Sequence, residues 1–249
     1  MVAALFALLG NELGAEAVPV RYPEGLVHGF LTLRTQDGRT IADGDLSQVA
    51  SGAQVTSRLT FHFRDGSLYD ETAVFTQRDQ FRLVSYRMVQ KGKSFPRPLE
   101  MSIDSGTGQV DVRYTDDEGE TKTESERMEL PADLANGLMQ TLLKNIRSAP
   151  LSVSYVAATP KPRLVKLEIT TAAPVRFSTG QRGRSAIHYV LKVEIGGLSG
   201  LLAPLVGKQP PDIHVWIAGG DAPAFLRAEA PLSPDGPLFR TELIAPVWR

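Results

Sequence analysis

The chain has 249 residues, 42% of them hydrophobic and 22% charged, which is ordinary for a globular protein and enough to form a core. Lysine and arginine total 27 against 28 aspartate and glutamate, so no strong electrostatic field attracts nucleic acid. The sequence contains no cysteine, which excludes disulfides, thiolate nucleophiles and cysteine-based zinc sites.

The first 17 residues have the pattern of a signal peptide. Val2–Leu9 is a short apolar run, and Ala15-Glu16-Ala17 places small residues at both key positions of a cleavage site. We therefore expect cleavage after Ala17, a mature single domain of residues 18–249, and a periplasmic or secreted location. No lysine or arginine precedes the apolar run, so an N-terminal amphipathic helix packed on the domain is the alternative. The run is too short to span a bilayer.

Most of the remaining chain alternates between apolar and polar side chains, which is typical of strands with one buried face. Residues 55–63 and 67–77 alternate in this way around Asp65-Gly66, which predicts a hairpin. Similar turns are expected at Asp37-Gly38 and Asp235-Gly236. The other predicted strands cover residues 99–103, 110–114, 165–169, 187–195, 213–217, 224–230 and 239–244.

One segment has helical periodicity instead. Apolar side chains recur every three or four residues from Leu134 to Ile146, between Pro131 and Pro150. This spacing predicts an amphipathic helix over residues 132–147, whose wide apolar stripe needs a sheet face as its partner. The predicted fold is therefore mainly β: an antiparallel meander that forms a curved open barrel, or half-barrel, packed on one amphipathic helix.

An apolar segment interrupts the polar loops at residues 196–207. Glycine and proline within it limit any helix to about one or two turns. We interpret the segment as a plug that closes one end of the core, with a mobile lid over a ligand as the alternative. The candidate apolar binding residues combine this segment with the tryptophan of the strand 213–217: Leu198, Leu201, Leu202, Leu205, Val206 and Trp216.

Three strings resemble catalytic or metal-binding motifs. Asp104-Ser-Gly-Thr has the pattern of an aspartic protease, but that chemistry needs two carboxylates and no second copy exists. Gly197-Leu-Ser-Gly misses the spacing of a serine-hydrolase elbow. Asp116–Glu120 lacks the spacing of a calcium loop and is predicted to be a solvated hairpin tip. No glycine-rich nucleotide-binding motif is present. These patterns favour a protein without catalytic activity or cofactor.

The four histidines, His28, His62, His188 and His214, fall within predicted strands and lack the local spacing of metal ligands. His62, His188 and His214 alternate with the main apolar row of their strands. We therefore expect solvated or hydrogen-bonded histidines on the opposite face, and no metal site.

The C-terminal part resembles a known type of envelope domain. Its run from Ile213 through Trp216, Pro223 and Arg227 to Glu229, followed by Gly236 and Leu243, is similar to the closing strands of a bacterial envelope domain of unknown function. That domain resembles the lipoprotein-carrier (LolA-like) open β-barrel. The resemblance implies a concave half-barrel and binding of acyl chains through apolar surface, and it supplies no catalytic residues.

Three classes of function follow from these observations. The first is an exported, non-catalytic protein that binds or carries an apolar, acyl-like or lipid-like ligand in a concave sheet. The alternative is a structural or interaction protein of the cell envelope without a small-molecule ligand. An enzyme ranks third, because the sequence shows no catalytic constellation. Neither a nucleic-acid partner nor an integral membrane span is expected.

Overall fold

The computed structural model describes residues 17–179, 182–194, 210–233 and 236–244. In this part of the chain, 14 strands form one sheet beside a short helix, α1 (Met139–Asn145). The strands are β1 (Val27–Thr35), β2 (Thr40–Ser51), β3 (Gln54–Phe63), β4 (Leu68–Gln77), β5 (Phe81–Lys91), β6 (Leu99–Asp104), β7 (Gln109–Thr115), β8 (Thr121–Arg127), β9 (Leu151–Ala157), β10 (Arg163–Thr179), β11 (Arg182–Glu194), β12 (Ile213–Ala218), β13 (Ala224–Pro231) and β14 (Leu238–Leu243).

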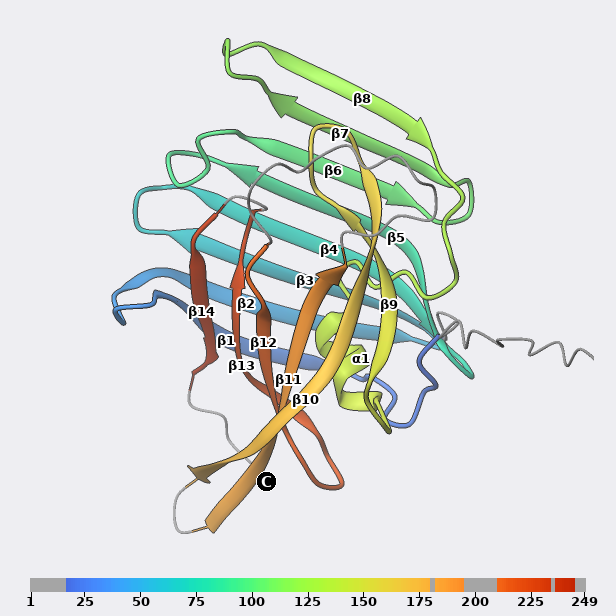
Figure 1. Cartoon of the computed structure of the whole chain (residues 1–249), viewed down its shortest axis with the longest axis vertical. Coiled ribbons are helices and arrows are strands. Elements are labelled where there is room, and N and C mark those ends of the chain that lie inside the picture. Colours follow the sequence, from blue (N-terminus) through green and yellow to red (C-terminus); the bar gives the residue numbers. More distant parts are fainter. Residues whose placement is uncertain (1–16, 180–181, 195–209, 234–235, 245–249) are drawn as a thin grey trace, which may run out of the picture.

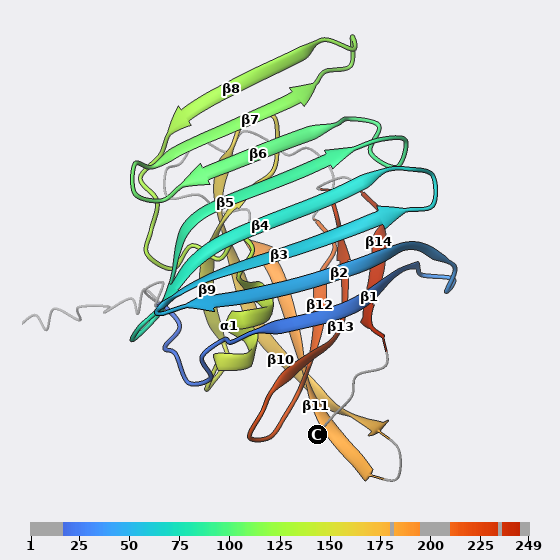
Figure 2. The same cartoon turned by 180° about the vertical axis from the view of Figure 1, so that it is seen from behind.

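The sheet is a meander that is folded into two halves. Its order is β8-β7-β6-β5-β4-β3-β2-β1-β14-β13-β12-β11-β10-β9, and every pairing is antiparallel. The β1–β14 pair, with Leu31 opposite Leu243, joins the half β1–β8 to the half β9–β14. Figures 1 and 2 show the two halves on either side of α1. The end strands β8 and β9 do not pair with each other, so the barrel is open, as predicted.

Alternating sequence and glycine turns produce the predicted hairpins. In β3, Val55 and Phe61 are fully buried, whereas Arg58 and His62 point to the other face and are exposed. Gly66, in the turn that follows, has φ of +84°, a conformation that glycine adopts without the penalty of a side chain. The hairpin predicted between residues 55–63 and 67–77 is thereby confirmed.

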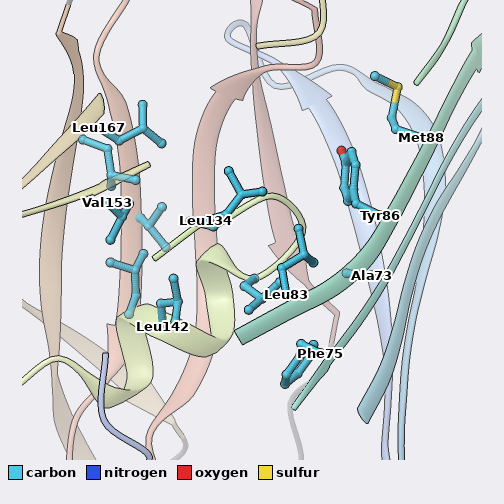
Figure 3. Packing of buried hydrophobic residues seen from close by; sticks show 14 of the residues in the cluster. Ala73, Phe75, Leu83, Tyr86, Met88, Leu134, Leu142, Val153 and Leu167 are labelled. Atoms are coloured by element: carbon cyan, nitrogen blue, oxygen red, sulfur yellow. The ribbon is translucent and has the colours of Figure 1, made fainter. Parts of the chain in front are cut away.

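The core fills the space between the two halves. Buried side chains from β4 and β5, among them Phe75, Leu83 and Met88, lie across from Val153 and Leu167 of the second half (Figure 3). Leucines of the connecting segment and of α1 lie between these two groups (Figure 3). Apolar contact between the halves therefore stabilises the fold.

The predicted helix is buried as expected but is shorter than predicted. It covers Met139–Asn145, and residues 132–138 are not helical. Gly137 has φ of +70°, which is incompatible with a continuing right-handed helix. Asn136 is fully buried and bonds to the backbone of β9 at Val156. Hydrogen bonding to the sheet therefore replaces the first turns of the predicted helix.

The start of the described chain packs on the domain. Val18 is buried, and its carbonyl accepts a hydrogen bond from the Phe81 N–H at 3.1 Å. The Asn145 side chain at the end of α1 accepts hydrogen bonds from the backbone N–H groups of Arg21 and Tyr22. These contacts fix residues 18–22 against both the sheet and the helix. Within the described residues, no helix is both long and apolar enough to cross a membrane.

Candidate functional site

The inner face of strands β1 to β7 carries a single carboxylate, Glu71. Cross-strand pairing places Leu46, Leu59, Glu71 and Met88 side by side in one inward-facing row. The neighbours of Glu71 in this row are therefore a leucine and a methionine. An apolar environment of this kind disfavours the charged form of a carboxyl group.

Two tyrosine hydroxyls hold the Glu71 carboxylate. Tyr69 donates a hydrogen bond to Oε2 of Glu71 at 2.6 Å, and Tyr86 donates to the same oxygen at 3.1 Å. Tyr69 precedes Glu71 by two residues on β4, so both side chains point to the same face. A register irregularity in the β4–β5 pair, between Leu83 and Ser85 of β5, turns Tyr86 to the inner face.

A third tyrosine approaches from the other half of the sheet. Tyr155 lies on β9, and burial, followed by the charge of Glu71, raises the pKa of its hydroxyl. The same two causes raise the pKa values of Tyr69 and Tyr86. Burial raises the pKa of Glu71 itself, and the hydrogen bonds from Tyr69 and Tyr86 lower it by a smaller amount. The four residues thus form one polar cluster between the two halves.

Apolar side chains that point inward from both halves remain partly exposed. Residues such as Phe61 and Met101 are fully buried, but other inward-facing residues that pack on the core keep some accessible area. We call these residues and Glu71 the inner surface; its members are Leu46, Leu59, Glu71, Leu99, Tyr114, Tyr155, Ala228 and Leu243. It combines apolar area with one polar cluster, the combination that is typical of small-molecule sites.

Of the residues predicted to bind an apolar ligand, the structure describes only Trp216, and it does not lie on this surface. Trp216 pairs with His188 of β11 and Arg227 of β13, while its neighbours Val215 and Ile217 point inward. Trp216 therefore lies on the outer face, and the sheet separates it from the inner surface. The other five predicted residues, Leu198, Leu201, Leu202, Leu205 and Val206, lie outside the described residues.

Trp216 instead forms an outer cluster with histidine and arginine. Its ring stacks on His188, with centroids 4.3 Å apart, and the Arg227 guanidinium lies 3.9 Å from the ring centroid. His188 Nε2 lies 2.9 Å from His214 Nδ1. Burial lowers the pKa of His188, and the neighbouring His214 and Arg227 lower it further. The prediction that these histidines lie on the face opposite the apolar row is confirmed. Their proximity to each other could not be predicted, because it depends on the register between β11 and β12.

Two other motifs singled out in the sequence are hairpin turns, and the third, Gly197-Leu-Ser-Gly, lies outside the described residues. Asp104 Oδ1 accepts hydrogen bonds from the backbone N–H groups of Gly106 and Thr107, at 2.9 and 3.0 Å. The carboxylate of Asp116 accepts the N–H groups of Glu118 and Glu120 in the same manner and contacts the Lys122 ammonium. The hairpin predicted at Asp104 and the solvated tip predicted at Asp116–Glu120 are both confirmed.

A shallow depression lies on the outer face, beside the irregular part of β5. It is lined by polar side chains that include Thr72, Arg87, Ser102 and Asp111. Arg87 pairs with Glu100 at 2.5 Å, so its charge is already compensated. The depression is open to solvent, and most of the residues that line it are polar. We therefore consider the inner surface to be the better candidate site.

Comparison with known proteins adds one fold-level likeness. No protein-family model matches the chain, and no curated protein matches it. A solved structure of a β-barrel-like protein of a domain of unknown function, DUF1849, from Brucella abortus aligns with 88% of this chain and 96% of its own. The TM-score is 0.49 and the sequence identity is 10%. This likeness concerns the barrel-like β fold alone.

The raised pKa of Glu71 predicts a pH-dependent gain in stability for Glu71→Gln. Because the folded protein favours neutral Glu71, the contribution of this residue to wild-type stability is fully present below the unfolded pKa, near 4.5, and is lost as pH rises through the folded value. The variant should melt at about the same temperature as wild type at pH 4 and at a higher temperature at pH 8, since each tenfold difference in proton affinity between the folded and unfolded states is worth about 1.4 kcal/mol. The measurement is thermal unfolding across this pH range.

The exposed Glu124 of β8 offers the matched control. Glu124→Gln should leave the melting temperature nearly unchanged at every pH. A constant difference between Glu71→Gln and wild type from pH 4 to pH 8 would contradict the expected titration.

Proposed function

We propose that this protein is an exported, non-catalytic binding protein that holds an apolar, acyl-like ligand between the two halves of its curved sheet. The observation that carries this proposal is the inner surface, where apolar side chains such as Leu59 and Leu243 stay partly exposed although they point inward. Water at apolar surface is unfavourable, so a ligand that replaces this water gains free energy.

The chemistry of the inner surface favours binding over catalysis. Glu71 is the single carboxylate among the inward-facing residues of β1 to β7, and its contacts are to tyrosine hydroxyls whose pKa values are raised. Tyrosines of this kind stay protonated at neutral pH and act as hydrogen-bond donors. Acid–base catalysis by a carboxylate pair needs a second carboxyl group nearby. We therefore propose that the protein binds its ligand without catalysing a reaction.

Export and the relation to lipoprotein carriers belong to the same proposal. The apolar run and the Ala15-Glu16-Ala17 string support removal of residues 1–17. A mature chain that begins at Val18 keeps the hydrogen bond from Phe81. The similarity of residues 213–243 to the closing strands of an envelope domain of unknown function, which itself resembles LolA-like carriers, supports an acyl chain as the ligand.

Binding of an uncharged apolar fluorophore tests the proposal. N-phenyl-1-naphthylamine should bind the wild-type protein with a micromolar Kd and gain fluorescence. Leu59→Ser should weaken binding about tenfold, because partial burial of one leucine side chain is worth about 1.4 kcal/mol. Val49→Ser is the control, since Val49 is 53% exposed and lies on the outer face of the neighbouring strand.

Two results would contradict ligand binding at the inner surface. One is a wild-type protein that binds no apolar fluorophore at micromolar concentration, which would favour the structural or interaction role. The other is an equal loss of affinity in Leu59→Ser and Val49→Ser, which would place the fluorophore elsewhere on the protein.

A further inference from the structure

We propose that the ligand of the inner surface carries a positively charged ammonium head group, which pairs with Glu71, beside an apolar chain that covers the neighbouring leucines. This inference rests on the proposed function, because it specifies the chemistry of the ligand at the same surface. Three features of the structure support it: the uncompensated charge of Glu71, its free carboxylate oxygen and the surrounding aromatic rings.

The first feature is the charge. The inward-facing residues of β1 to β7 include no lysine or arginine, because the basic residues of these strands, such as Arg58 and Arg87, point outward. Among the described residues, Glu71 makes no ion pair. The described part of the chain therefore supplies no positive partner for this carboxylate. A cationic head group would supply one in a setting where charge attraction is stronger than in water.

The second feature is the unequal use of the two carboxylate oxygens. Oε2 accepts both tyrosine hydroxyls, whereas Oε1 accepts no hydrogen bond from a described residue. Oε1 is not among the buried side-chain atoms that lack a partner, and Glu71 is partly exposed. Within the described part of the chain, one acceptor oxygen of the partly exposed Glu71 is thus left without a donor, and Tyr69 and Tyr86 fix the orientation of the carboxylate. A ligand that donates a hydrogen bond or carries a positive charge complements this oxygen.

The third feature is aromatic. Tyr69, Tyr86 and Tyr155 adjoin Glu71, and the ring of Phe95 lies 6.5 Å from the ring of Tyr69. Aromatic rings attract ammonium groups through their negative faces, and this attraction is larger where water is excluded. An anionic head group would instead meet the charge of Glu71 and the electron-rich rings. The arrangement therefore selects an ammonium over a carboxylate on an apolar chain of equal length.

Competition between ligands of equal chain length tests this inference. Decyltrimethylammonium, decanoate and 1-decanol would each displace N-phenyl-1-naphthylamine from the wild-type protein at pH 8. We expect decyltrimethylammonium to bind about tenfold more tightly than 1-decanol, and decanoate to bind most weakly. In Glu71→Gln, the ammonium should lose this advantage while 1-decanol binds as before. Glu124→Gln should retain the wild-type order.

The outcomes separate the inference from the proposed function. Equal affinities for the ammonium and the alcohol, or an ammonium preference that persists in Glu71→Gln, would overturn the head-group assignment and leave binding of an apolar chain in place. A failure of all three decyl compounds to bind would overturn both. Thermal unfolding of Glu71→Gln alongside these titrations confirms that the variant is folded.

Discussion

Replacing Leu138 by aspartate is expected to unfold the protein at room temperature. Leu138 directly precedes the first residue of α1, and its side chain is 1% exposed in the core between the two halves. The substitution would bury a carboxylate without a partner, which costs several kcal/mol. The whole stability of a domain is about 5 to 15 kcal/mol, so this single change removes a large part of it. Loss of the cooperative thermal transition, followed by circular dichroism, is the measurement.

Leu164→Asp is the matched control for this substitution. Leu164 lies on β10 and is 37% exposed, so the same chemical change there leaves the carboxylate in contact with water. Its melting temperature should fall by no more than a few degrees. A Leu138→Asp protein that melts within error of wild type would show that contact between α1 and the sheet halves is peripheral to stability.

The strands that were predicted correctly share a simple physical feature. In β3, β6 and β12, one face meets the core and the other meets solvent or polar neighbours, so apolar residues recur at every second position, apart from Ser57 of β3. Turn residues such as Asp65-Gly66 then mark where each strand ends. These local features were sufficient to predict a curved antiparallel meander with one helix.

Three strands were not among those predicted, each for its own reason. In β5 an irregularity shifts the inward-facing residues from Phe81 and Leu83 to Tyr86 and Met88, which breaks the alternation. β8 has no apolar residue, because it is an exposed edge strand. Both faces of β9 carry buried residues, and the connection before α1 covers its free edge. Alternation of apolar and polar residues therefore identifies strands with one solvated face, but it does not identify strands that are exposed or buried on both faces.

The candidate site was missed although part of its signal was present. Within the predicted strand 67–77, Glu71 shares the spacing of Tyr69, Ala73 and Phe75, so it belongs to the buried face. A carboxylate at such a position is uncommon unless it has partners. Its partner Tyr86 could not have been inferred, because the position of Tyr86 depends on the irregular register of β5. The outward position of Trp216 could have been inferred from its alternation with Val215 and Ile217.

The second large effect on stability is expected in the segment before α1, which takes the place of the first turns of the predicted helix. Asn136 is fully buried, donates a hydrogen bond to the Val156 carbonyl at 2.9 Å and accepts one from the Val156 N–H at 2.8 Å. Asp133 accepts the Ser154 N–H at 3.0 Å, and Ser154 accepts the Ala135 N–H. These bonds satisfy the free edge of β9, which would otherwise expose unpaired backbone groups.

Asn136→Ala is therefore expected to destabilise the protein by about 2 to 6 kcal/mol, because it leaves two buried backbone groups of Val156 without partners, at about 1 to 3 kcal/mol each. The melting temperature should fall by about 2 to 4 °C for each kcal/mol in a domain of this size. The Val156 amide should also exchange with deuterium faster than in wild type, since its acceptor is gone.

Gln54→Ala, at an exposed position of β3, is the control and should change neither the melting temperature nor the exchange rate at Val156. If Asn136→Ala lowered the melting temperature without accelerating exchange at Val156, the loss would come from packing, and the edge of β9 would not depend on Asn136. Faster exchange together with concentration-dependent association would instead show that this side chain keeps the open barrel from pairing with a second copy through its free edge.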